Sequence, residues 1–350
     1  MEAGAYPQIY IFCFFLFLMK KKSLIISITI GVAVFLIFLN WVGLGAIASV
    51  FKRVNLGYLA IYFIISSATF LPQVFRWQVI LRGHNKDVGF LMLLRQTIAG
   101  YAVSYITPAV RLGGEPLRAY MLKKEADVDL RTGSSSIIID KFVELIGSLV
   151  FGAIGLVLLI FIPGVSFWFK LVLASLILYG FYGLFVLYYR TVTDRGSFSE
   201  LFIRFRFIKI ERIKGFVNTL QDVEKRLKEF FTKHKKELFI SCFFYFMYGV
   251  MAVFEFKFLL LGLGVDASLS VVILSLTILG LMYFIPVPAA LGFLEAGQTS
   301  LFYILEKEGG IGFVLSLVTR VRNLIFVALG FSLISYFSGG EIEKRIKKKK

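Results

Sequence analysis

Long apolar runs separated by short polar breaks make up most of this chain. A helix needs about 20 mostly apolar residues to cross the hydrocarbon core of a bilayer. Apolar runs of about that length or slightly less are Ser23–Asn40, Leu56–Ile80, Phe90–Ile106, Ser134–Ile162, Val165–Tyr189, Leu238–Leu261, Leu269–Ile285 and Ile311–Phe337. The pattern predicts an all-α polytopic membrane protein with about six to eight transmembrane helices.

The first residues do not fit this pattern. The run from Ile9 to Leu18 is too short to span a bilayer, and Met19 and three lysines follow it directly before the first full-length run. We interpret residues 1–18 as an N-terminal extension that is not native and not required. The alternatives are an interfacial helix or the remainder of a signal peptide.

A basic segment, residues 190–237, separates the apolar runs into two groups. Its first part, 202–209, alternates apolar and basic residues, and its second part repeats apolar residues at helical spacing from Ile213 to Phe230. This periodicity predicts one amphipathic helix. The helix lies either on the membrane surface or against the helix bundle, and the sequence favours neither.

The distribution of positive charge indicates which loops we expect on the cytoplasmic side of the membrane. The chain has 350 residues, is 58% hydrophobic and carries a formal net charge of +17. The positive charge is concentrated at Lys20–Lys22, in 190–237 and in the tail 338–350, which we therefore place in the cytoplasm with both termini. The loops at 163–164 and 262–268 carry no positive charge and fit outside, whereas Lys52 and Arg53 are exceptions on that side.

Two stretches break the apolar pattern in the same way. They read Pro108-Ala-Val-Arg-Leu-Gly113-Gly114-Glu115-Pro116-Leu-Arg118 and Pro286-Val-Pro288-Ala-Ala-Leu-Gly292-Phe-Leu-Glu295, and in each a proline precedes a glutamate by seven positions. Proline and glycine break helices. Broken segments in corresponding places of two halves are typical of a transporter's binding site.

The positions of the charged loops require both broken stretches to return to the side they came from. We therefore predict two opposed re-entrant Pro/Gly hairpins and an inverted repeat. The predicted parts are a first transmembrane half at 19–189 with a hairpin near 90–118, the basic cytoplasmic segment 190–237, and a second half at 238–337 with a hairpin near 269–305. A multi-pass protein of the cell membrane follows from this arrangement.

Charged residues inside apolar runs are costly and mark candidate site residues. Asp140 and Glu144 lie four residues apart and therefore on one helical face. The alternative to a site role is that both side chains extend to the membrane interface. Arg320 and Arg322 lie deep in the last run and need carboxylate partners, in a binding site or in a structural ion pair. Glu255 and Lys257 point in different directions, and we interpret them as structural or rim charges.

The first broken stretch resembles a phosphate cradle. Arg111 and Arg118 bracket Gly113 and Gly114, whose backbone N–H groups a tight turn would expose to an anion. Arg118 is alternatively an anchor at the interface. Glu115, like Glu295 in the second stretch, is a counter-ion to arginine, a proton carrier or a helix cap.

Other chemistries find no support in the residues. The two cysteines and two histidines form neither a disulfide framework nor a zinc set, so we expect no metal and no cofactor. We found no Walker loop and no Gly-x-Ser-x-Gly elbow, and we expect neither catalysis nor nucleic-acid binding.

These motifs resemble those of the flippase-like family known as the lysylphosphatidylglycerol synthase transmembrane region. The resemblance covers about Lys20 to Phe337 and rests on Thr107 to Tyr120, on Asp140-Lys-Phe-Val-Glu144, on Pro286 to Ala296 and on an arginine in the last span. Alanines 289 and 290 stand where the family usually has glycine. The resemblance implies movement of a lipid headgroup across the bilayer, and because this sequence includes no aminoacyl-transferase domain we do not expect it to synthesise the lipid.

We therefore predict a lipid flippase or transporter that moves a phosphate-bearing lipid, either a phospholipid or a polyprenyl-linked one, through a polar cavity at the midplane. The alternatives are a membrane-embedded transferase acting on a lipid-linked sugar and a small-solute carrier. The expected partners are membrane lipids with an anionic headgroup, and a homodimer is compatible with the pattern. The substrate-binding residues that we predict are Arg111, Gly113, Gly114, Glu115, Arg118, Asp140, Glu144, Pro288, Gly292, Glu295, Arg320 and Arg322.

Overall fold

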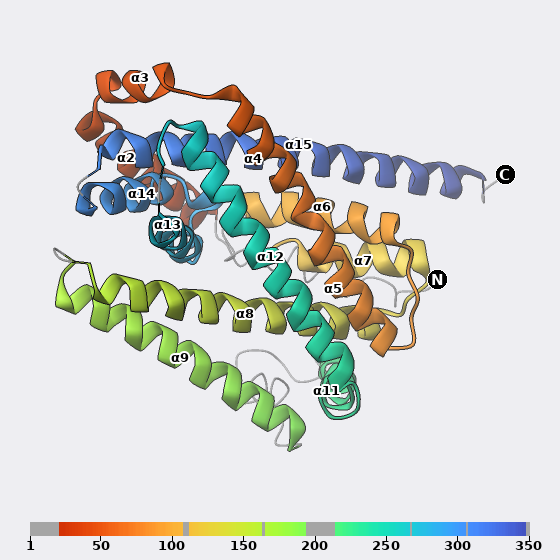
Figure 1. The fold of residues 1–350 in the computed structure, drawn as a ribbon. Helices are drawn as coiled ribbons and strands as arrows, with labels where there is room; N and C mark the ends of the chain where they lie inside the picture. Colours follow the sequence, from red (N-terminus) through yellow and green to blue (C-terminus); the bar gives the residue numbers. More distant parts are fainter. Residues whose placement is uncertain are drawn as a thin grey trace. The chain divides into compact units, whose positions relative to one another are not determined.

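The chain is helical over the residues that the structure, a computed structural model, describes: 21–107, 112–162, 165–193, 214–266, 268–305 and 307–347 (Figure 1). Its elements are α2 (Lys21–Val42), α3 (Leu44–Lys52), α4 (Leu56–Ala68), α5 (Phe70–Gly83), α6 (Phe90–Ile106), α7 (Glu115–Ala126), α8 (Leu130–Ile160), α9 (Phe167–Val192), α11 (Lys214–Lys233), α12 (Lys235–Gly262), α13 (Leu269–Met282), the 3-10 turn η2 (Pro288–Ala290), α14 (Phe293–Ile304) and α15 (Gly309–Lys347).

The predicted fold class is confirmed. Within these described ranges, six helical stretches are long and apolar enough to cross a membrane, and α6 and α13 are shorter apolar helices. The helices α4 and α5 run on as one such stretch, Leu56–Gly83. The short helix α3 is an element that the sequence pattern did not predict.

The described chain forms two compact units that interleave along the sequence. The first unit comprises residues 71–93 and 119–251, and the second comprises residues 21–70, 94–118 and 252–347. The second unit thus combines the first apolar runs with the last ones, whereas the described part of the first unit comes from the middle of the chain. The predicted boundaries after residues 189 and 237 divide the chain into consecutive parts, whereas these units are defined by packing. The boundaries therefore stay a prediction.

In the first unit, the amphipathic helix α11 packs on the bundle. The helices α8 and α9 lie side by side (Figure 1), and α11 contacts both of them. Its apolar residues Val223, Leu227 and Phe230 are buried in one cluster with Ile139 and Phe142. The structure therefore favours bundle packing over the alternative of a helix on the membrane surface. The alternating stretch 202–209 lies outside the described residues.

Asp129 explains why α8 begins several residues before the predicted span. Its carboxylate accepts hydrogen bonds from the backbone N–H groups of Arg131 and Thr132, at 3.1 and 3.0 Å, and so caps the helix. Partial burial of Asp129 opposes ionisation, but the hydrogen bonds from Thr132 outweigh it, and the pKa of Asp129 lies below its usual value. The carboxylate is thus held ionised at the helix N-terminus, where negative charge is favourable.

In the second unit, α13 and α14 form a helical hairpin that starts and ends at one end of the unit. Helices of 14 and 12 residues are about 21 and 18 Å long, less than the hydrocarbon thickness of about 30 Å. Near the start of α13, the N–H of Asn55 donates to the carbonyl of Gly262 at 2.8 Å. Beyond the end of α14, Arg53 pairs with Glu308 at 2.6 Å. The two short helices therefore leave this end and return to it.

The same contacts gather three loops that the charge pattern assigned to one side. Arg53, Gly262 and Glu308 lie together, although Arg53 seemed an exception when loops were sorted by charge. Its guanidinium is neutralised by a carboxylate, and Lys257 is likewise paired with Asp266 at 2.6 Å. Lys52 and Arg53 remain exceptions to the charge rule, and the side of the membrane on which these loops lie stays a prediction.

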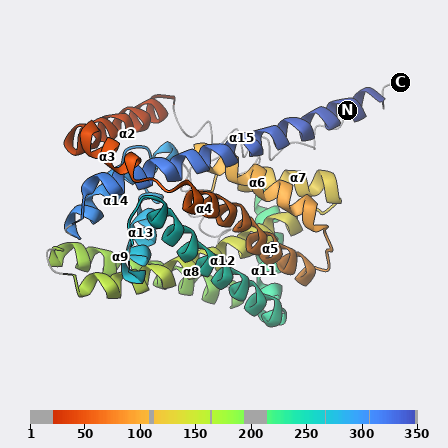
Figure 2. The same cartoon turned by 45° about the horizontal axis from the view of Figure 1, so that its top comes forward.

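Glycine is required where α2 meets the second hairpin. Gly292 has a φ of +78°, and a Cβ there would collide with the backbone carbonyl of Gly31 in α2. A side chain at this position would be strained by its backbone conformation and would also push the two segments apart. On another side of the hairpin, α14 lies along α15, as Figures 1 and 2 both show.

The packing of α11 makes a prediction about stability. Because Leu227 is fully buried among protein side chains, Leu227→Ala should lower the free energy of unfolding by about 2–5 kcal/mol. The measurement is thermal or denaturant unfolding of the purified protein in detergent without added lipid. Lys225→Ala, on the exposed face of the same helix, is the control and should change little. Equal stability of both variants would mean that α11 does not pack on the bundle in solution.

Candidate functional site

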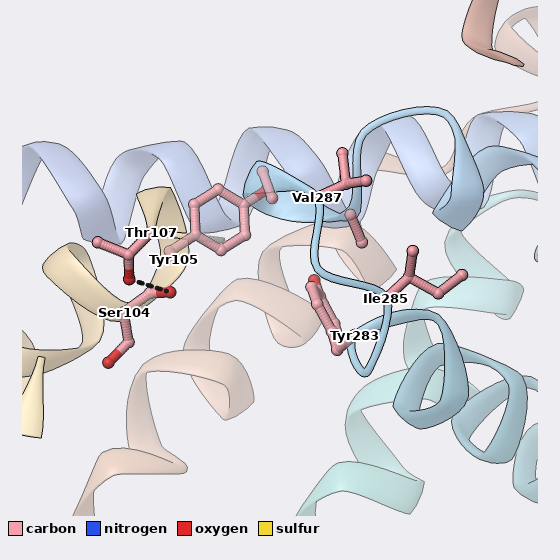
Figure 3. Close-up of a pocket in the computed structure, with 8 residues that line it drawn as sticks. Ser104, Tyr105, Thr107, Tyr283, Ile285 and Val287 are labelled. Carbon is pink, nitrogen blue, oxygen red and sulfur yellow. Dashed lines mark hydrogen bonds between the residues drawn. The ribbon is translucent and has the colours of Figure 1, made fainter. Parts of the chain in front are cut away.

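The tips of the two broken stretches meet around a small cavity in the second unit. Ser104, Tyr105 and Thr107, which lie at the end of α6 just before the first stretch, line one wall. Residues 283–290, which connect α13 to η2, form the opposite wall. Figure 3 shows the ring of Tyr105 pointing from α6 toward this second wall. Segments far apart in the sequence thus build one site.

The second tip holds two alanines in the left-handed region of backbone conformation. Ala289 and Ala290 have φ angles of 55° and 48°. For a residue with a Cβ this conformation costs roughly 1–2 kcal/mol, whereas glycine adopts it freely. These are the two positions where glycine was expected from the family resemblance. Both alanines therefore adopt a backbone conformation that glycine would adopt without strain.

Glu295 and Arg320 hold this strained tip. One oxygen of the Glu295 carboxylate accepts hydrogen bonds from Nε and Nη2 of Arg320, at 2.9 and 2.6 Å. The other oxygen accepts from the backbone N–H of Gly292 at 2.9 Å. The remaining arm of the guanidinium, Nη1, donates to the carbonyl of Ala289 at 3.3 Å. Glu295 is therefore a helix cap and an arginine counter-ion at once, two roles that the sequence left as alternatives.

The first tip is closed by a backbone contact and an ion pair. The N–H of Gly114 donates to Ser104 Oγ at 2.9 Å, and a Cβ on Gly114 would collide with the carbonyl of Gly100. Arg118 pairs with Glu115 at 2.9 Å, and both side chains are mostly buried. Glycine is needed here for close approach of the two helices. The ion pair joins two side chains at the start of α7 and ties the first turn of that helix together.

A polar cluster on α15 lies beside these tips. Arg322 pairs with Glu255 of α12, which also accepts a hydrogen bond from Ser66 Oγ of α4 at 2.7 Å. Asn323 bonds Tyr101 of α6 and the hydroxyl of Tyr283 at the second tip. Glu255 is only 4% exposed, so it is not the rim charge that the sequence offered as one interpretation. Lys257, by contrast, pairs with the exposed Asp266 at the rim.

Buried arginines pair with glutamates among the described residues of the second unit. Three arginines of this cluster and of the tips each face a glutamate; the pairs are Arg118–Glu115, Arg320–Glu295 and Arg322–Glu255. A charge without a partner would be very costly in this environment, whereas a neutral pair with further hydrogen bonds is tolerated.

The first unit has its own buried charge cluster. Arg76 of α5 donates to Asp140 of α8 at 2.6 Å and lies 3.6 Å from the carboxylate of Glu144. Lys141 pairs with the same Glu144 oxygen at 2.9 Å, and the Arg76 guanidinium lies over the ring of Tyr245. Asp140 is 1% exposed, so its carboxylate does not reach out to the interface. The predicted pair Asp140 and Glu144 is brought together by an arginine that was not among the predicted residues.

The predicted site residues are distributed over both units. In the second unit lie Gly113, Gly114, Glu115, Arg118, Pro288, Gly292, Glu295, Arg320 and Arg322. In the first unit lie Asp140 and Glu144, and Arg111 is outside the described residues. That all of these residues line one cavity therefore stays a prediction.

Five residues of these clusters were missed or undervalued from the sequence; they are Arg76, Tyr101, Glu255, Tyr283 and Asn323. Arg76 did carry a signal, because it is a charge within the apolar run 56–80. The tyrosines carried none, since aromatic residues are common throughout this chain. For metals, the described ranges hold no group of three or more His, Cys, Asp or Glu side chains placed to bind an ion.

Fold and site together define a polytopic helical membrane protein in which the end of α6 and the segment after α13 line a small cavity. The profile of the lysylphosphatidylglycerol synthase TM region matches residues 24–330. The chain belongs to this family.

Curated relatives share most of the length of the chain. A UPF0104 membrane protein of Methanothermobacter thermautotrophicus is 22% identical over 338 residues, which cover 94% of this chain and 100% of the relative. A UPF0104 membrane protein of Pyrococcus horikoshii is 24% identical over 324 residues, covering 87% of this chain and 92% of the relative. No solved structure matches the chain significantly.

The cluster in the first unit predicts a strong coupling between two residues. Arg76→Met removes the arginine partner of the buried Asp140 carboxylate and should destabilise the protein by about 3–5 kcal/mol. The double variant Arg76→Met, Asp140→Leu removes both charges and should recover most of that loss. The measurement is a double-mutant cycle of unfolding free energies in detergent.

An exposed pair in the same unit serves as the control for this cycle. Arg82 and Asp87 lie 3.3 Å apart with side chains that are 59% and 80% exposed. Arg82→Met should cost less than about 1 kcal/mol. If Arg76→Met is equally mild, the Arg76–Asp140 pair does not form in the folded protein.

Proposed function

We propose that this protein is a flippase or transporter that moves a phosphate-bearing lipid, a phospholipid or a polyprenyl-linked lipid, across the membrane. The single observation that carries the proposal is that the end of α6 and the segment after α13 line one cavity, with the buried Arg320 bonded to the lining residue Ala289. Transporters place their substrates where discontinuous helices meet near the bilayer midplane. The hairpins are then re-entrant, as α13 and α14 are too short to span.

The arginine–glutamate pairs supply a mechanism for binding an anion. A phosphate offers a guanidinium the same bidentate geometry as a carboxylate, so the two compete for one arginine. When a headgroup binds Arg118, Glu115 is displaced, and when the headgroup leaves, the pair forms again. The site is neutral without substrate and exposes no lone charge to the hydrocarbon. The lipid tails stay in the bilayer throughout.

Opening of the site involves the second tip. The cavity as it stands is too small for a lipid headgroup, so the two tips must separate. Ala289 and Ala290 are strained in the closed arrangement, and a movement that returns them to ordinary backbone conformations releases that strain. Arg320 opposes this movement through its bond to the Ala289 carbonyl. Transport then alternates between the two faces of the membrane.

The family name suggests the main alternative function, that of a membrane-embedded transferase. The matched profile is named for the membrane region of a lysylphosphatidylglycerol synthase. We propose that this chain moves lipid and does not alter it covalently. A multi-pass location in the cell membrane with cytoplasmic termini, and lipids with anionic headgroups as partners, complete the proposal.

The test is lipid movement in reconstituted liposomes. Arg118→Lys keeps the charge but loses the bidentate fork, and Glu115→Gln removes the competing charge, so each should reduce the rate by at least about tenfold, which corresponds to about 1.4 kcal/mol. The measurement follows a fluorescent phosphatidylglycerol from one leaflet to the other, and lipid extracts analysed by mass detect any covalent change.

Matched controls come from the exposed pair at the end of the second unit. Arg53→Lys and Glu308→Gln make the same chemical changes in a pair whose side chains are 47% and 54% exposed, and they should leave the rate unchanged. Glu295→Gln is unsuitable as a functional test because the Glu295 carboxylate also accepts the backbone N–H of Gly292 and so shapes the second tip. Unmodified rates in both Arg118→Lys and Glu115→Gln would refute this site, and a covalently altered lipid would support the transferase.

A further inference from the structure

Asn323 contacts both hairpins from a third helix. It is completely buried in α15. Its Oδ1 accepts a hydrogen bond from the hydroxyl of Tyr101 in α6, at 2.8 Å. Its Nδ2 donates to the hydroxyl of Tyr283, just beyond the end of α13, at 2.9 Å. One side-chain amide therefore links the helix that leads to the first tip with the start of the second.

The neighbouring arginine fixes which way this amide points. Nε and Nη2 of Arg322 lie 3.0 and 2.7 Å from Asn323 Oδ1. A guanidinium only donates hydrogen bonds, so the atom facing it must be the amide oxygen. The amide nitrogen is then left for Tyr283, whose hydroxyl accepts the bond. The Arg322–Glu255 pair in turn holds the guanidinium in place.

The two tyrosines connect this amide to the walls of the cavity. Tyr283 itself lines the cavity. Tyr101 lies one helical turn before Tyr105, another lining residue, and their rings stack with centroids 6.1 Å apart. A change at Asn323 is therefore transmitted to both walls through one residue on each side.

We propose that Asn323 is a positioning residue that clamps the two hairpin tips together and sets how often the cavity opens. The ion pair Arg320–Glu295 ties α15 to the second hairpin, and Arg118–Glu115 lies within the first. The bonds of Asn323 to the tyrosines bridge the two hairpins and are hydrogen bonds between neutral groups, which are weaker than charge-assisted ones. They are the polar contacts that break most readily when the tips part. The clamp itself does not require lipid, and only its effect on transport rests on the proposed function.

The test measures the distance between the tips directly. Thr107 and Val287, which line the cavity from opposite walls, are changed to cysteine and spin-labelled after Cys13 and Cys242 are replaced by serine. In this background we expect Asn323→Leu, which is similar in size but has no polar atoms, to lengthen and broaden the distribution of distances between the labels.

Single-bond variants separate clamping from general stability. Tyr101→Phe and Tyr283→Phe each remove one hydroxyl and should broaden the distance distribution while keeping the melting temperature near that of the parent. The matched control Tyr303→Phe removes a hydroxyl from a 65% exposed tyrosine of α14 and should leave the distribution unchanged. Adding Tyr283→Phe to Asn323→Leu should have no further effect, since both act through the same bond.

The outcomes for the clamp and for transport are distinct. If Asn323→Leu, Tyr101→Phe and Tyr283→Phe all keep the parent distance distribution, the clamp does not exist. If they broaden it while the unmodified protein moves no lipid, the clamp stands and the proposed function fails. If the clamp and transport are both real, Tyr283→Phe should change the rate of lipid movement at least twofold, and Tyr303→Phe should not.

Discussion

A helix that breaks inside a membrane protein frees backbone groups that hydrocarbon cannot satisfy, and this constraint governs the second unit. Here side chains take over the freed groups. Glu295 accepts from the N–H of Gly292, Arg320 donates to the carbonyl of Ala289, and Ser104 accepts from the N–H of Gly114. Two of these residues, Glu295 and Arg320, are also among the predicted substrate-binding residues. Structure and proposed function share the same side chains.

The second requirement is that no buried charge stands alone, and it explains the pairing across helices. Once Arg320 is used to hold the tip, Glu295 must accompany it, and the same holds for Arg322 with Glu255 and for Arg76 with Asp140. Each pair joins two different helices. The pairs therefore fix which helices are neighbours within a unit, and removing one member leaves a charge in a place that cannot solvate it.

The sequence predicted the spans and the breaks well because both depend on local composition. The limits of α6 agree with the predicted run, and Pro288 and Gly292 lie at the second break as expected. The sequence could not predict which side chains distant in the chain contact one another. Nothing in the order of residues links Arg76 with Asp140 or Asn323 with Tyr101, because such contacts depend on how helices pack. The second unit is a property of the same kind, since it combines segments from distant parts of the chain.

Ala289 and Ala290 show how a departure from a family pattern is accommodated. Glycine at both positions would make the turn free of strain and would allow many other conformations. Alanine has fewer accessible backbone conformations than glycine, so the turn loses less conformational entropy on folding. The left-handed conformation, however, costs energy for alanine. The Arg320 bond to the Ala289 carbonyl and the burial of Ala290 in the cluster around Tyr105 offset this cost. The tip of this chain is consequently stiffer than a glycine turn, and its closed form depends more on its neighbours than on its own backbone.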